Sequence, residues 1–126
     1  MQGALGVPVN YSAENIAVGE AFSGTGDFLR PNSLEAIGYL LDNGVKVALV
    51  YGDRDFACNW IGGEEVSTAI GYSMSDKFKA AGYTPILSSV GVGGQVRQYG
   101  NFSFSRVYQA GHEGKCASSI PGVMLT

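Results

Sequence analysis

The most regular hydrophobic run in the chain covers residues 45–51 and consists of Val-Lys-Val-Ala-Leu-Val-Tyr, with Gly44 before it and Gly52 after it. An almost continuous apolar, β-branched run of this length is typical of a strand covered on both faces, as in a parallel sheet flanked by helices. We therefore expect a buried parallel strand here, in a fold of the α/β class.

The residues before this run show two helical patterns. A short helix is predicted over residues 14–22, with Ser12 as its N-cap. A second helix is predicted from Asn32 or Ser33 to Gly44. Its apolar residues recur at helical spacing and should face a core: Leu34, Ile37, Leu40 and Leu41.

The residues after the run show one helical and one alternating pattern. Residues 64–81 are predicted to form a single helix, with acidic residues in the first turn and lysines in the last. Residues 95–108 alternate polar with apolar or aromatic side chains, which predicts a β-hairpin turning at Gly100-Asn101. The second arm of this hairpin leads to His112, the one histidine in the sequence.

Composition narrows the class of partner. The 126 residues include eight Lys and Arg against eleven Asp and Glu, a net charge of −3, with no basic run longer than two residues. Nucleic acid and an anionic membrane are therefore not expected as partners. No apolar stretch approaches the roughly 20 residues of a spanning helix, and the opening MQGALGVPVN lacks the features of a signal peptide.

Candidate chemistry lies where the predicted strands end. Asp53 and Asp55 follow the hydrophobic run, and His112 follows the second hairpin arm. Loops at the carboxyl ends of strands gather at one rim of an α/β sheet, so an acid and an imidazole should meet there. An aspartate that accepts the Nδ1 proton suits a histidine acting as general base, and acid before histidine is the α/β-hydrolase order. A solvent-facing histidine and an aspartate turn remain the alternative.

The other short motifs give weaker evidence about chemistry. Cys58 and Cys116 are far apart in sequence, and we do not expect them to form a disulfide. Asn10 and Asn101 begin Asn-x-Ser sequons, which are glycosylation acceptors in a secretory pathway or else chance matches. No cluster has metal-ligand spacing, and the glycines of residues 91–94 precede a hairpin rather than a helix, so neither a metal nor a cofactor is expected.

Longer motifs resemble a known family. They are VALVYGDRDFACNW, RQYGNFSFSRVYQAGHE and LGVPVNY, together with Gly26-Asp27 and the GEE that follows Gly62. From about Gly3 to Glu113 the chain closely resembles the C-terminal part of the serine carboxypeptidases, especially their secreted or vacuolar fungal members. The resemblance implies a C-terminal fragment of an α/β-hydrolase fold. It also implies an enzyme that removes C-terminal residues from peptides through an acyl-enzyme.

The resemblance assigns roles to individual residues. The second aspartate of the family's Gly-Asp-x-Asp element is the triad acid, which corresponds to Asp55, and the histidine of Ala-Gly-His corresponds to His112. Cys58, three residues after the acid, corresponds to an unpaired cysteine that lines the substrate pocket in part of the family. Asp53 is expected to support the loop, and Trp60 to pack under the site.

The resemblance also implies that parts of the enzyme lie upstream. No Gly-x-Ser-x-Gly occurs in this sequence, so the nucleophile, the oxyanion hole and part of the sheet are expected in a missing N-terminal part. We therefore expect this chain to be inactive alone, with an incomplete sheet. The alternative is a non-catalytic peptide-binding or interaction module on the same scaffold.

The last residues depart from the family pattern. Residues 114–126 have no helical period and no resemblance to the family, so the family part is expected to cover residues 1–113. Gly114-Lys115-Cys116 can be encoded by GGT AAG TGY, which contains a splice-donor-like GTAAGT. Our hypothesis is that the reading frame continues into an unspliced intron after Glu113.

Overall fold

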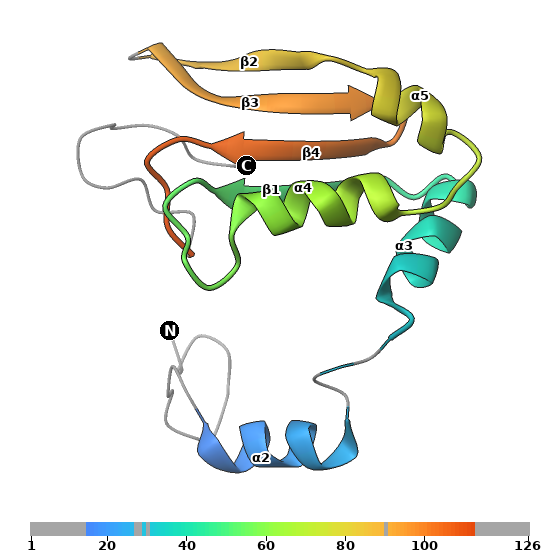
Figure 1. Ribbon diagram of the computed structural model, residues 1–126, viewed down its shortest axis with the longest axis vertical. Helices are drawn as coiled ribbons and strands as arrows, with labels where there is room; N and C mark the ends of the chain where they lie inside the picture. Colours follow the sequence, from blue (N-terminus) through green and yellow to red (C-terminus); the bar gives the residue numbers. More distant parts are fainter. Residues whose placement is uncertain (1–14, 27–28, 30, 90, 113–126) are drawn as a thin grey trace, which may run out of the picture. The chain divides into compact units, whose positions relative to one another are not determined.

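The computed structural model describes residues 15–26, 29, 31–89 and 91–112, which fall into two compact units divided after Pro31 (Figure 1). The first unit contributes helix α2, Ile16–Thr25. Asn15 caps it by accepting the N–H of Val18, and Gly26 ends it with a φ of 72°. The predicted helix thus begins later than expected and has a different cap; Ser12 lies outside the described residues.

The second unit is built on a four-stranded mixed sheet with the strand order β1-β4-β3-β2. The strands are β1 Val47–Gly52, β2 Tyr83–Ser88, β3 Gly91–Tyr99 and β4 Phe102–Val107. β1 and β4 are parallel, and the other two pairs are antiparallel. The predicted parallel strand and hairpin are confirmed, whereas β2 was not predicted. β2 contains Pro85, which an edge strand tolerates.

Three described helices accompany the sheet: α3 Ser33–Asp42, α4 Trp60–Ala69 and α5 Ser75–Ala80. Figure 1 shows α4 running along β1. The core between helices and sheet is aromatic, with the Phe78 and Phe102 rings 4.4 Å apart and Tyr72 edge-on to Phe102 at 5.9 Å. No helix in the described part of the chain is both long enough and apolar enough to span a bilayer.

The single helix predicted over residues 64–81 is wrong, because two helices occupy this region. α4 begins already at Trp60, where Asn59 caps it by accepting the N–H of Gly62 at 2.9 Å. The chain leaves the helix at Ile70, whose backbone is extended and whose side chain is 1% exposed. Burying Ile70 and Tyr72 in the core requires a break that helical periodicity alone does not reveal.

The expectation that residues 45–51 are covered on both faces is also wrong for the described residues. Along β1, Val47, Leu49 and Tyr51 are half-buried against the core, whereas Ala48 and Val50 are exposed, Val50 by 44%. The described helices supply the core on one face only. The apolar side chains on the opposite face explain why the sequence suggested burial on both faces.

Asn101 joins the hairpin to the start of the sheet. Its Nδ2 donates to the backbone oxygens of Leu41, at 2.9 Å, and of Val45, at 2.7 Å, so both amide hydrogens are used. Its own carbonyl accepts the N–H of Val47 at 2.9 Å. A glycan on Nδ2 would leave one hydrogen and cost at least one of these bonds, which argues against Asn101 as an acceptor in the folded chain.

Candidate active site

The loops after β1 and β4 come together because these two strands are parallel neighbours. Backbone pairing continues past the strands: the N–H of Asp53 donates to the carbonyl of Val107, and that of Arg54 to the carbonyl of Ala110, each at 2.9 Å. A β-carbon on Gly52 would overlap the carbonyl of Ala110. Only glycine at this position allows the histidine loop to pass so close to the end of β1.

Asp55 and His112 meet between these loops. Asp55 Oδ2 lies 2.9 Å from His112 Nδ1, and Asp55 Oδ1 accepts the N–H groups of Ala57 and Cys58, each at 2.9 Å. The Asp55 side chain is 6% exposed and the His112 side chain 65% exposed. A fixed acid therefore holds an imidazole that remains open to reacting groups.

The charge state of Asp55 determines the tautomer of His112. The backbone N–H of Cys58 lowers the pKa of Asp55, with further lowering by the His112 hydrogen bond and the Ala57 N–H, against the opposing effect of desolvation. An ionised carboxylate can only accept, so Nδ1 of His112 must carry the proton. The lone pair of the neutral ring then lies on Nε2, where a general base requires it.

Cys58 lies in the same loop and has an exposed, free thiol; Cys116 lies outside the described residues. Ligand atoms of Asp55, Cys58 and His112 lie within 4.8 Å of one another. A carboxylate, a thiol and an imidazole can ligate a divalent cation such as Zn²⁺. Spacing along the chain did not indicate this group, because its members come from two loops that only the fold brings together.

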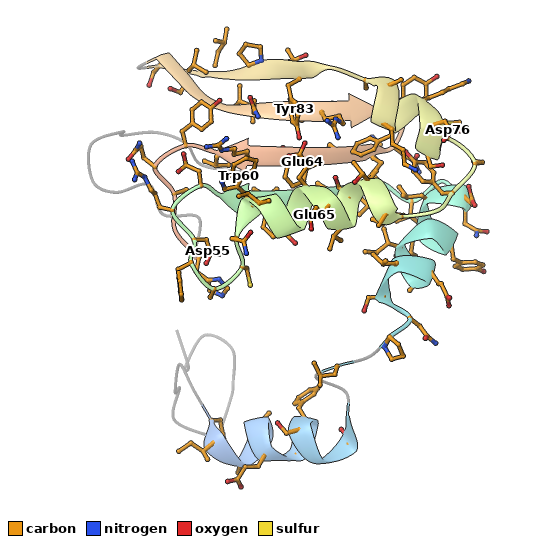
Figure 2. All side chains as sticks on the ribbon, viewed as in Figure 1. Asp55, Trp60, Glu64, Glu65, Asp76 and Tyr83 are labelled. Atoms are coloured by element: carbon orange, nitrogen blue, oxygen red, sulfur yellow. The ribbon has the colours of Figure 1, made fainter. Side chains whose placement is uncertain are left out.

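Trp60 and Arg106 lie beside the loop that carries Asp55. Figure 2 shows Trp60 at the start of α4, directly after that loop. The guanidinium of Arg106 lies 3.7 Å from the centroid of the Trp60 ring, and its Nη2 lies 3.7 Å from Asp53 Oδ2. Sequence reasoning missed Arg106, whose one signal was its charge within an otherwise uncharged hairpin arm.

A second polar network, also missed, ties α4 to the far strands of the sheet. Glu64 Oε1 accepts the hydroxyl of Tyr83 at 2.6 Å and Nη2 of Arg97 at 3.3 Å. Desolvation, together with the hydrogen bond to Glu64, raises the pKa of Tyr83 to about 12. The phenol therefore stays a hydrogen-bond donor at neutral pH, and the network supports the fold at a distance from Asp55.

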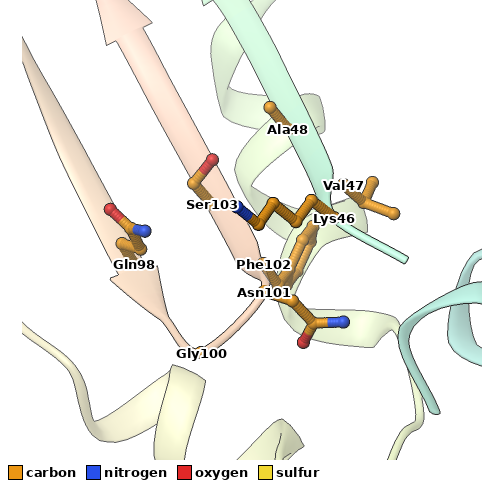
Figure 3. Close-up of a pocket in the computed structure, with 8 residues that line it drawn as sticks. All are labelled: Lys46, Val47, Ala48, Gln98, Gly100, Asn101, Phe102 and Ser103. Atoms are coloured by element: carbon orange, nitrogen blue, oxygen red, sulfur yellow. The ribbon is translucent and has the colours of Figure 1, made fainter. Parts of the chain in front are cut away.

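A hollow of about 330 Å³ opens at the other end of the strands (Figure 3). Its lining includes Lys46, directly before β1, and Ala48 in β1, with Gln98 and Ser103 from the hairpin. These residues stand at the amino end of β1, whereas Asp55 follows its carboxyl end. The hollow is therefore not part of the site formed by Asp55 and His112.

Comparison with known proteins gives consistent matches. The serine carboxypeptidase family model matches residues 1–124. Carboxypeptidase S1 homolog B from Arthroderma otae is 59% identical over 114 residues, 90% of this chain and 17% of that protein. Carboxypeptidase Y homolog from Arthroderma benhamiae is 50% identical over 117 residues, 89% of this chain and 19% of that protein. Carboxypeptidase S1 from Penicillium janthinellum is 34% identical over 111 residues, 87% of this chain and 26% of that protein.

These matches bear on the extent of the chain and on its family. The chain spans about a fifth of the length of these relatives. The matched range reaches into residues 114–126, which lie outside the described residues, as do Asn10 and Glu113. The separation of this tail and its origin in an intron stay predictions. Because the family model matches nearly its whole length, the chain belongs to the serine carboxypeptidase family.

Proposed function

We propose that this chain is the C-terminal part of a serine-type carboxypeptidase of the α/β-hydrolase fold, in which Asp55 orients His112 as the general base and acid. The observation that carries the proposal is the 2.9 Å contact between Asp55 Oδ2 and His112 Nδ1 at the ends of two parallel strands. Family membership supplies the reaction type.

The proposed reaction begins with a serine hydroxyl from outside this sequence. His112 Nε2 takes its proton as the serine oxygen attacks the carbonyl carbon of the last peptide bond, and Asp55 stabilises the imidazolium. The imidazolium then gives the proton to the leaving amine, which frees the C-terminal residue and leaves an acyl-enzyme. Water, deprotonated by His112, hydrolyses the acyl-enzyme and restores the serine. Cys58 would line the pocket, and no cofactor takes part.

Reconstitution tests this proposal. We expect the chain alone to resist labelling by a serine-directed phosphonate. When it is co-expressed with the preceding part of carboxypeptidase S1 homolog B, labelling and hydrolysis of an N-blocked dipeptide should appear. His112→Asn should then lower kcat/KM by about a thousandfold or more, whereas the matched Lys46→Gln change, at the opposite end of β1, should not. Labelling of the isolated chain, or full activity of His112→Asn, would contradict the proposal.

The second candidate is a non-catalytic peptide-binding or interaction module on the same scaffold. Tight peptide binding without turnover in the reconstituted protein would support it.

We also propose a secreted or vacuolar location, as in the fungal enzymes that the sequence resembles. Glycosylation at Asn10 in a fungal host would support that location, and an unmodified asparagine together with cytosolic recovery would count against it.

A further inference from the structure

The histidine loop contains an unusual backbone conformation. Gln109 has a φ of 58°, and it is the one described residue other than glycine with a positive φ. The left-handed region is sterically disfavoured for a residue with a β-carbon, so surrounding contacts must hold it. Gln109 stands three residues before His112, in the segment that leads to the imidazole.

The loop after β1 supplies the contacts that hold Gln109. Asp53 Oδ1 accepts the backbone N–H of Gln109 at 2.7 Å, and Arg54 Nη2 donates to Gln109 Oε1 at 3.1 Å. The Asp53 side chain is 12% exposed, whereas that of Arg54 is 64% exposed. Both bonds involve a charged group, but the bond to Asp53 is shorter and its carboxylate is less exposed to solvent, so Asp53 is the main support of this conformation.

Asp53 is itself held in place from two sides. Its Oδ2 lies 3.7 Å from Nη2 of Arg106, whose guanidinium lies over the Trp60 ring, and its Oδ1 lies 3.9 Å from Nε of Arg54. Its backbone N–H also donates to the carbonyl of Val107. The carboxylate is therefore a fixed point, and the Gln109 N–H is attached to it.

We propose that Asp53 is a positioning residue, which fixes the backbone at Gln109 and thereby directs His112 Nδ1 toward Asp55. Asp53 precedes Asp55 by two residues, and Gln109 precedes His112 by three, so the two loops are joined at two successive contacts. The first contact orders the loop and the second selects the tautomer. The inference rests on the proposed function, because a directed imidazole matters only where His112 exchanges protons.

The tautomer of His112 is a direct readout. Since this is the one histidine of the sequence, its ring nitrogens give unambiguous ¹⁵N NMR signals in the full chain. In the neutral ring, the hydrogen bond made by one nitrogen decides the tautomer. We expect the Nδ1–H form to dominate in the unmodified chain, and Asp53→Ala to lower its fraction at least twofold while the chain remains folded.

Matched variants separate positioning from general destabilisation. Asp42 Oδ1 accepts the N–H of Ser73 at 2.8 Å, the same kind of bond elsewhere in the unit, so Asp42→Ala should cost stability and leave the tautomer unchanged. Gln109→Gly keeps both the N–H and the left-handed backbone, and should also leave the tautomer of His112 unchanged. Gln109→Val, which disfavours a positive φ while Asp53 is kept, should lower the Nδ1–H fraction even if Asp53→Ala fails to fold.

The outcomes distinguish this inference from the function on which it rests. A wild-type Nδ1–H fraction in Asp53→Ala or Gln109→Val overturns the positioning role and leaves the pairing of Asp55 with His112 intact. A chain whose His112 is not in the Nδ1–H form overturns both. If the tautomer shifts as expected but the reconstituted protein does not hydrolyse peptides, the proposed function is rejected and the positioning role of Asp53 stands.

Discussion

The Asp55 carboxylate links local geometry to pH dependence. Because hydrogen bonds from Cys58, His112 and Ala57 favour its charged form, its pKa lies below the ordinary value of 3.8. A group whose pKa is lower in the folded state stabilises that state above its unfolded pKa. The stabilisation is lost as the pH falls through the folded pKa. The folded state should therefore become less stable on acidification, because Asp55 becomes protonated.

Asp55→Asn tests this linkage. The variant should have a lower urea midpoint than the unmodified chain near neutral pH, because an amide accepts the N–H groups more weakly. The difference should shrink as the pH falls below 3.8 and on through the lower pKa of the folded chain, because the carboxylate is then protonated in both states. Glu65→Gln, at an exposed position in the middle of α4, serves as control and should show no such convergence. A difference that stays constant across this range would contradict the assignment.

At the scale of elements, the break between α4 and α5 is held by α3. Gly38 of α3 faces the break, and a β-carbon there would overlap the carbonyl oxygen of Gly71. Asp42 at the end of α3 accepts the N–H of Ser73. The close approach of two backbones explains why a glycine stands in the middle of α3, where it is otherwise unfavourable.

Gly38→Ala should therefore destabilise the unit, although a change from glycine to alanine inside a helix ordinarily stabilises by about 0.5–1 kcal/mol. The overlap with a backbone carbonyl cannot be relieved by rotating a side chain, and we expect a net loss of about 1–3 kcal/mol in urea unfolding. Gly71→Ala is the matched control: no atom lies within 4 Å of its β-carbon position, and the change should stay within about 0.5 kcal/mol. Equal effects of both changes would rule out the close approach as the cause.

Patterns among neighbouring residues in the sequence correctly predicted the elements that depend mainly on those residues. The strand at residues 45–51 and the hairpin followed from run length and alternation, and the placement of Asp55 near His112 followed from the rule for strand ends. The break after Ala69 could not be predicted, because it depends on α3, which is distant in sequence. The left-handed Gln109 was missed because no sequence signal marks an ordinary residue held at positive φ by a distant carboxylate.

At the scale of the whole molecule, the second face of the sheet is the main feature that the described helices leave uncovered. Strand register places one row of side chains across this face: Val50, Ser105, Val96 and Thr84. Val50 stands on β1, at one end of the described strand order, and is 44% exposed. An exposed apolar side chain on an edge strand promotes association. We propose that upstream parts of the carboxypeptidase domain cover it.

This proposal predicts how the isolated chain behaves in solution. It should self-associate in analytical ultracentrifugation, and Val50→Lys should raise the monomer fraction several-fold because it replaces an exposed apolar side chain with a charge. Thr84→Lys puts the same charge in the same row without removing an apolar group, so it controls for net charge and should have a smaller effect. In the reconstituted protein Val50→Lys should instead be harmful: it should reduce recovery of peptidase activity, because the covering segments then bury a lysine, and Thr84→Lys should reduce it less. Equal effects of the two lysines in both assays would mean that charge alone governs association, and that β1 does not carry the surface on which the rest of the domain packs.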